Sequence, residues 1–153
     1  MKFQPKKGQI DYTNVHWCPV MNCVVMHKDK ILIVQRSSAV GFYPEYWNGI
    51  SGFLDDDRSL EMKVREEIEE ELGIDSQKIE SIELGEIFHQ KSEQYNKTWI
   101  VHPVLVEVST DEVKTDWEAQ GYRWISMKEV YDYKLLPGFD KVIKGIKKII
   151  KNK

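Results

Sequence analysis

The chain has 153 residues, of which 41% are hydrophobic, and its formal net charge is -3. This length predicts a single domain over residues 1–153, and the mild charge argues against nucleic acid or an anionic membrane as the main partner. No apolar run reaches the roughly eighteen residues that a membrane-spanning helix needs. The first dozen residues contain no apolar stretch of signal-peptide length, so we expect a cytoplasmic protein.

Two β-prone stretches near the start of the chain predict a hairpin. Residues 20–27 and 31–35 are apolar, and the polar residues 28–30 form the turn between them. An aromatic loop follows over residues 36–47, in which Pro44 prevents regular structure. Its rings could stack on a nucleobase or anchor the loop in the core; they belong to Phe42, Tyr43, Tyr46 and Trp47.

The middle of the chain predicts a short strand followed by a helix. Residues 48–53 are strand-like and rich in glycine, and an acidic run follows at 55–57. Ser59 is a favourable residue to begin a helix, because its hydroxyl can accept from a free backbone N–H of the first turn. Gly73 suits the left-handed conformation that commonly ends one, so we predict a helix between these two residues.

The second half predicts further strands and two helices. Residues 79–89 and 98–108 predict a longer hairpin, and residues 121–125 predict another strand. Ser126 and Glu129 have the spacing of a capping box that opens a short helix. Strands that alternate with helices in this way predict an α/β fold, with a mixed β-sheet covered on both faces in an α/β/α sandwich.

The last helix is predicted to follow Pro137 and to be amphipathic. Six lysines between residues 141 and 153 occupy one side of it. Its apolar residues fall at helical spacing; they are Val142, Ile143, Ile146, Ile149 and Ile150. We interpret it as a helix packed on the sheet with a solvated lysine face, the alternative being contact with a membrane or nucleic acid.

Three glutamates of the predicted central helix occupy unusual positions for charged residues. With about 100° of rotation per residue, its apolar residues form one stripe, namely Leu60, Val64, Ile68 and Leu72. Glu71 falls inside that stripe, Glu67 at its edge and Glu70 about 60° further round. Carboxylates so close together repel one another unless a cation neutralises them, and their hard oxygens suit Mg²⁺ or Mn²⁺. The three residues therefore predict a divalent metal site, whereas Glu66 and Glu69 are interpreted as solvent-facing.

These glutamates lie in a segment, residues 52–74, that resembles the Nudix box. The pattern of the box is G-x5-E-x7-R-E-U-x-E-E-x-G-U, where U is aliphatic, and it fits without a gap from Gly52 to Gly73 and Ile74. The resemblance implies the Nudix fold, dependence on Mg²⁺ with Mn²⁺ as the alternative, and hydrolysis of a phosphoanhydride bond. The implied substrate is a small molecule in which a nucleoside diphosphate is linked to another group. A homodimer is compatible with the sequence, which leaves the oligomeric state open.

The resemblance also implies roles for individual acidic residues. Glu67, Glu70 and Glu71 correspond to the metal ligands of the box, and the backbone carbonyl of Ser51 is a further candidate ligand. The family commonly takes one more carboxylate from a loop before a late strand, and Glu118 resembles it. The candidates for the catalytic residues are Glu67, Glu70 and Glu118, which could activate water as a base or hold the metal.

Three residues are predicted to bind the substrate. Arg36, at the end of the second predicted strand, stands where relatives often hold a substrate phosphate. Tyr46 and Trp47 are the aromatic residues that we predict to stack on a base.

Two positions of the box depart from the pattern. Arg58 stands where the box has Glu, and Glu66 stands where it has Arg. In the family these residues hold the loop against the helix, so exchanging both charges would preserve an ion pair. We predict that Arg58 and Glu66 form that pair, with Arg65 as the rival partner. Ser51 also replaces the first glycine of the usual Gly-Gly, and none of these changes removes a metal ligand.

Two rival functions are compatible with such a fold. An isoprenoid diphosphate isomerase would require a catalytic cysteine in addition to the glutamates. Cys18 and Cys23 lie early in the chain without such a context, and we interpret them as reduced structural thiols. A catalytically inactive ligand-binding or sensor domain is the other rival, and the intact glutamates argue against it.

Overall fold

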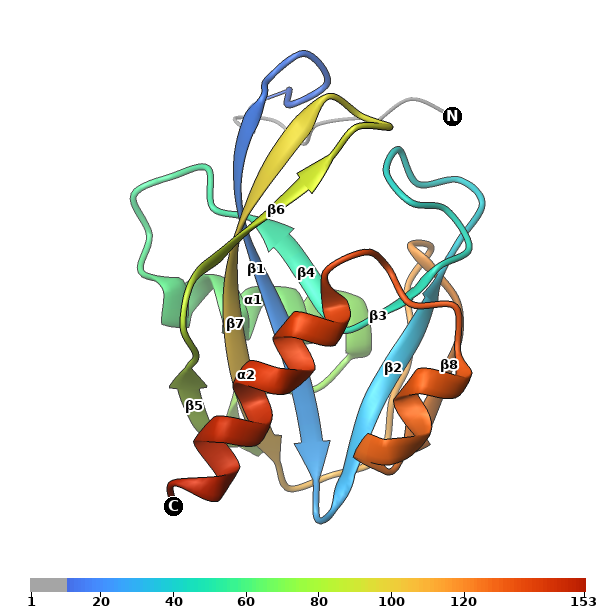
Figure 1. Cartoon of the computed structure of the whole chain (residues 1–153). Coiled ribbons are helices and arrows are strands. Elements are labelled where there is room, and N and C mark those ends of the chain that lie inside the picture. Colours follow the sequence, from blue (N-terminus) through green and yellow to red (C-terminus); the bar gives the residue numbers. More distant parts are fainter. Residues whose placement is uncertain (1–10) are drawn as a thin grey trace.

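The computed structural model describes residues 11–153, and these form one mixed sheet of eight strands. Its centre is a parallel pair, β1 (Trp17–His27) and β7 (Lys97–Val108), which lie side by side along their length (Figure 1). The remaining pairs are antiparallel. They involve β2 (Lys30–Arg36), β3 (Trp47–Asn48), β4 (Ile50–Phe53), β5 (Ile79–Leu84), β6 (Phe88–Ser92) and β8 (Ala119–Ile125).

The two long helices lie on opposite faces of this sheet. In Figure 1, α2 (Phe139–Lys151) crosses in front of the central strands and α1 (Leu60–Leu72) lies behind them. Strand β1 serves both faces, because its side chains alternate: Val24 packs in the core beneath α2, whereas Cys23 and Val25 pack in the core beneath α1. The predicted α/β/α sandwich is therefore confirmed.

The caps of α1 form as predicted. The Ser59 hydroxyl accepts a hydrogen bond from the backbone N–H of Met62 at 3.2 Å. Gly73 ends the helix in the left-handed conformation, with φ of 65°, and its N–H donates to the carbonyl of Glu69. These caps define the length of the helix that bears the glutamates.

The predicted long hairpin is wrong in one detail, because its first strand is interrupted. Strand β5 pairs with β7 up to Leu84 and β6 resumes at Phe88, so the segment 85–87 is not part of either strand. Pro103 of β7 stands opposite this interruption. Proline has no N–H to donate to the neighbouring strand. Its carbonyl accepts a hydrogen bond from the N–H of Gly85 at 2.8 Å.

The C-terminal elements also follow the prediction, with one change of helix type. The backbone N–H and the hydroxyl of Ser126 both donate to the Glu129 carboxylate, which completes the predicted capping contact. The helix that it opens is the 3₁₀ helix η2 (Met127–Asp132), and a second one, η1 (Ser76–Lys78), follows α1. No helix within residues 11–153 is long and apolar enough to cross a membrane. The expectation that the chain starts without a signal peptide concerns its first dozen residues. Of these, residues 1–10 lie outside the part of the chain that the structure describes.

Candidate active site

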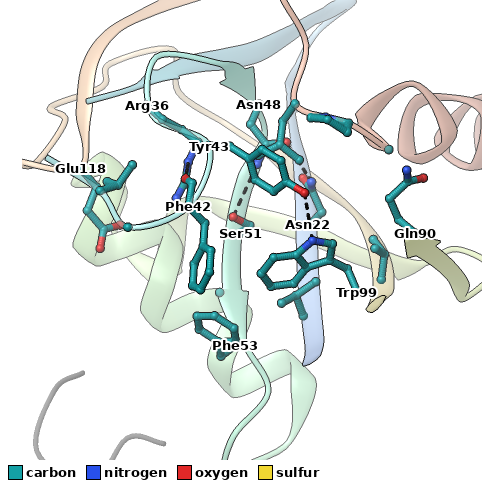
Figure 2. Close-up of a pocket in the computed structure, with 18 of the residues that line it drawn as sticks. Asn22, Arg36, Phe42, Tyr43, Asn48, Ser51, Phe53, Gln90, Trp99 and Glu118 are labelled. Atoms are coloured by element: carbon teal, nitrogen blue, oxygen red, sulfur yellow. Dashed lines mark hydrogen bonds between the residues drawn. The ribbon is translucent and has the colours of Figure 1, made fainter. Parts of the chain in front are cut away.

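A cavity of about 310 Å³ lies where α1, the aromatic loop and the start of α2 meet the sheet. Figure 2 shows the side chains that line it. Its polar lining consists of Asn22, Arg36, Asn48, Ser51, Glu67, Gln90 and Glu118. Its aromatic lining consists of Phe42, Tyr43, Phe53, Trp99 and Trp117. The cavity therefore combines a few charged groups with a large flat apolar surface, as small-molecule sites commonly do.

Two carboxylates, Glu67 and Glu118, line one end of this cavity, and that of Glu71 lies next to both. Glu67 and Glu71 lie one turn apart on α1, and Glu118 comes from the loop before β8. Burial, and then the negative charges of Glu118 and Glu67, raise the pKa of Glu71 well above its usual range. The Oε2 atom of Glu71 is buried and has no hydrogen-bond partner within residues 11–153. The structure thus brings together three of the predicted acidic residues, although they lie 51 positions apart at most in the sequence.

The close approach of β4 to α1 depends on Gly52. A Cβ atom built on Gly52 would lie 3.2 Å from both Cγ and Cδ of Glu67. Only a residue without a side chain leaves that space, so Gly52 allows Glu67 to lie directly against the strand. Ser51, the neighbouring residue, lines the cavity beside it.

Glu118 is held in place through its backbone. Its carbonyl accepts a hydrogen bond from the N–H of Ser37 at 2.8 Å. Its N–H donates to the Asp116 carboxylate at 3.0 Å. These bonds fix the loop before β8 against the aromatic loop and direct Glu118 to the cavity.

Arg36 supplies positive charge beside the carboxylates. Its side chain is half-buried, and its Nε donates to the carbonyl of Phe42 at 3.0 Å. Burial lowers the pKa of the guanidinium, and the charges of Glu71 and Glu118 oppose that change. An arginine stays protonated in any case, so a cation faces the cavity at this end.

The structure does not bring Glu70, Tyr46 and Trp47 to the cavity. Glu70 is exposed on α1 and is not a lining residue. Lys134 lies over the ring of Tyr46, with Nζ 4.4 Å from the centroid. Trp47 pairs with β2 and packs against Tyr133, with the ring centroids 5.0 Å apart. Both rings turn toward the segment after η2, and Phe42 and Tyr43 of the same loop face the cavity in their place.

The sequence analysis missed several lining residues, among them Trp99, Gln90 and Asn22. Trp99 lies in a strand and resembles an ordinary core residue, and nothing around Gln90 distinguishes it. Asn22 does offer a signal, because it is a polar residue in an otherwise apolar strand. Its amide nitrogen donates to the Oδ1 of Asn48 at 2.9 Å.

The predicted pair of Arg58 and Glu66 is confirmed. The two side chains form an ion pair, and Arg58 also pairs with Asp56 at 2.7 Å. The rival, Arg65, pairs instead with Glu61 at 3.1 Å, which excludes it as the partner of Glu66. The loop before α1 is therefore tied to the helix by the exchanged charges.

A buried lysine, which the sequence analysis did not identify, fixes the same loop. Lys63 of α1 has only 5% of its surface exposed. Its ammonium pairs with Asp55 at 2.8 Å and with Asp56 at 3.2 Å. A charge this deeply buried requires partners, and the two aspartates provide them.

The donor chemistry of the carboxylate cluster fits a divalent cation. Within residues 11–153 no three His, Cys, Asp or Glu side chains are already arranged as a metal site. The buried Oε2 of Glu71 nevertheless lacks a partner, and its neighbours Glu67 and Glu118 are also carboxylates. Hard oxygens that repel one another in a buried position are suited to Mg²⁺ or Mn²⁺.

Neither cysteine is suited to catalysis. Cys18 and Cys23 are buried free thiols. Burial raises the pKa of both, and the charges of Glu71 and Glu67 raise that of Cys23 further. The reactive form of cysteine is the thiolate, which such surroundings disfavour. The structure therefore offers no support for an isomerase that uses a cysteine.

Comparison with known families gives a match over most of the chain. A family model for the NUDIX domain matches residues 17–146. A search of curated proteins finds no match.

Solved structures confirm the predicted Nudix fold. A C. elegans Ap4A hydrolase has a TM-score of 0.70 at 15% identity, covering 89% of this chain and 99% of that chain. A MutT protein from Methanosarcina mazei Go1 has a TM-score of 0.68 at 20% identity, covering 90% and 98% respectively. The NUDIX domain of Shewanella oneidensis NrtR, complexed with ADP ribose, has a TM-score of 0.69 at 18% identity and covers 88% of both chains.

Proposed function

The chain belongs to the Nudix family of hydrolases, and on that premise we propose that it cleaves a phosphoanhydride bond with water in a metal-dependent reaction. The substrate is a nucleoside diphosphate linked to another group. One observation supports this proposal above all: the unpartnered buried oxygen of Glu71 lies beside Glu67 and Glu118, two carboxylates that line the charged end of a ligand-sized cavity. Such a cluster is unfavourable by itself and favourable once a cation joins it.

The acidic residues would hold the metal. Glu67 and Glu71 are its principal ligands in this proposal, together with the carbonyl of Ser51. The Nudix box also implies Glu70, which is exposed and lies outside the cavity lining. Such an ion supplies positive charge to the diphosphate oxygens and makes water more acidic. Glu118 accepts the proton of the attacking water, because it lines the cavity whereas Glu70 does not.

Arg36 and the aromatic residues would orient the substrate. The guanidinium of Arg36 lies at the charged end, where it can donate to a phosphate oxygen. The rings of Phe42 and Trp99 exclude water from the other part of the cavity and can stack on a flat group. Two structures with this fold support a ligand of nucleotide type, since one is an Ap4A hydrolase and another is complexed with ADP ribose.

A hydrolysis assay tests the proposal. The purified protein is incubated with nucleoside triphosphates, dinucleoside polyphosphates and nucleotide sugars, each with Mg²⁺, with Mn²⁺ or with EDTA. We expect at least one class to be cleaved at a phosphoanhydride bond with either metal and none with EDTA. Binding without cleavage in every class would contradict the proposal and favour the inactive ligand-binding domain.

A further inference from the structure

We propose that the indole ring of Trp117 stacks on a second base of the substrate, so that the protein prefers a polyphosphate joining two nucleosides over a nucleoside triphosphate. The inference rests on the proposed function, because it assumes that a diphosphate binds at the carboxylate cluster. It deepens that function by naming the group on the far side of the diphosphate. It follows from the exposure of Trp117 and from its position at the charged end of the cavity.

Trp117 differs from the other aromatic residues of the cavity lining in being open to solvent. It lines the cavity, and yet 64% of its surface is exposed. The other four rings of the lining are buried or half-buried; they belong to Phe42, Tyr43, Phe53 and Trp99. A ligand can therefore reach the indole of Trp117 from the cavity, and covering this ring removes a large apolar surface from water.

The cavity offers two separate aromatic surfaces. The interior rings contact one another, since the centroid of Phe42 lies 5.2 Å from that of Trp99 and 6.3 Å from that of Phe53. None of the ring contacts within residues 11–153 involves Trp117. Trp117 directly precedes Glu118, which Figure 2 shows on the side of the cavity opposite Trp99. The exposed indole is thus a second aromatic surface, next to the charged end.

A hydrogen-bonded turn holds the backbone of Trp117 in this position. Trp117 and Glu118 are the central residues of the turn, which the N–H of Ala119 closes by donating to the carbonyl of Asp116 at 3.3 Å. The Asp116 carboxylate accepts from the N–H of Glu118 at 3.0 Å. The N–H of Ser37 donates to the carbonyl of Glu118 at 2.8 Å. The backbone is therefore ordered before a ligand binds, which lowers the entropic cost of stacking on the ring.

Two aromatic surfaces suit a substrate with a ring on each side of its phosphates. When the diphosphate binds beside Arg36 and the carboxylates, one nucleoside lies across the interior rings. The group on the other side of the diphosphate then leaves the charged end at the rim, where Trp117 lies. A terminal phosphate gains little from an indole, whereas a base that stacks on an aromatic side chain gains about tenfold or more in affinity. The exposed ring therefore favours a second nucleoside.

Binding of analogues that water cannot cleave tests the inference without hydrolysis. Calorimetry with Mg²⁺ compares diadenosine triphosphate with ATP and diguanosine triphosphate with GTP, each with methylene groups in place of the bridging oxygens. We expect the wild-type protein to bind the two-nucleoside member of at least one pair about tenfold more tightly.

Three variants assign this preference to the ring. Trp117→Ala should abolish the preference without lowering the melting temperature, because the side chain is exposed. Trp117→Phe keeps an aromatic ring and should retain most of the preference. Trp17→Ala is the matched control, because Trp17 is 55% exposed in β1 and lies outside the cavity lining, and it should leave the preference unchanged.

The results separate this inference from the proposed function. Equal affinity for both members of each pair, no binding of any analogue, or a preference that survives Trp117→Ala would overturn it, even if metal-dependent hydrolysis is found. A preference that is lost in Trp117→Ala, in a protein that hydrolyses nothing, would support the role of Trp117 and contradict the proposed function.

Discussion

Arg58, in the loop before α1, forms an ion pair with Glu66 on that helix. The Nudix box has the opposite charge at each of these positions, so the attraction survives although both signs are exchanged. The side chains are only partly exposed, at 38% and 39%, and Asp56 adds a second partner for Arg58. The pair connects the loop to α1, the helix that bears the glutamates of the candidate active site.

Exchanging the two charges together should be tolerated better than either change alone. Arg58→Glu and Glu66→Arg each place like charges opposite one another, so we expect each to lower the melting temperature and the rate of hydrolysis. The double variant places the two charges as the Nudix box has them. It should recover part of the lost melting temperature and part of the lost rate of hydrolysis. Thermal unfolding and kinetics of the four proteins form a double-mutant cycle, and strictly additive effects would show that the pair has no role.

Gly52→Ala should impair activity more than folding. The added methyl group would meet Cγ and Cδ of Glu67 at 3.2 Å and Cε of Met21 at 3.3 Å, so Glu67 must shift by a few tenths of an ångström. Small displacements of a catalytic group are costly, and we expect kcat to fall about tenfold. The control is Gly145→Ala, where a Cβ atom meets nothing within 4 Å. Equal rates for the two variants would argue against a close contact between β4 and Glu67.

Arg36→Met should weaken substrate binding. The substitution removes the positive charge beside Glu71 and Glu118 but keeps an apolar side chain of similar length. A charge-assisted hydrogen bond to phosphate corresponds to about 10- to 100-fold in kcat/KM, and we expect most of it as a higher KM. Arg123→Met, at an exposed position of β8, serves as the control. An unchanged KM in Arg36→Met would exclude Arg36 from phosphate binding.

The loop before α1 should lose stability in acid. Hydrogen bonds from Arg58, with a further contribution from Lys63, lower the pKa of Asp56 below its usual value. A lowered folded pKa means that the contribution is present above the ordinary aspartate pKa and is lost as the pH falls through the folded value. Asp56→Asn should therefore show a smaller drop in melting temperature than the wild-type protein between about pH 5 and about pH 3. Asp57→Asn, also exposed, should behave like the wild type, and identical curves for all three proteins would contradict the account.

The sequence could predict those parts of the site that depend on local spacing. Glu67 and Glu71 follow from the turn of a helix whose two caps can be recognised in the sequence. Glu118 follows from the family pattern, because no local signal connects it to the helix. The positions of most predicted strands also follow from their apolar pattern and from turns. The exceptions are the interruption opposite Pro103 and the predicted strand over residues 48–53, which is divided between β3 and β4.

The rest of the site depends on how distant segments pack. Tyr46 differs from Phe42 in which side of an irregular loop it occupies, and a loop has no periodicity from which that side could be predicted. Trp47 belongs to the strand β3, whose two residues are too few to show a periodicity. Lys63 lies on a charged helix and becomes buried only because the loop with Asp55 folds over it. Gln90 lines the cavity beside Gly138, which is 48 positions later in the sequence.

Glu71→Gln, compared with Glu69→Gln on the same helix, tests most directly whether the buried carboxylate cluster is a metal-dependent catalytic centre. The measurement is the rate of hydrolysis of the best substrate as a function of Mg²⁺ concentration, with the melting temperature in EDTA as the check on folding. We predict that Glu71→Gln loses at least about 100-fold in kcat, as removal of a group that stabilises developing charge does, without a lower melting temperature in EDTA. The exposed Glu69 should tolerate its substitution, and Glu70→Gln should fall between the two. A Glu71→Gln protein that hydrolyses substrate at the wild-type rate, with the same dependence on Mg²⁺, would contradict the account.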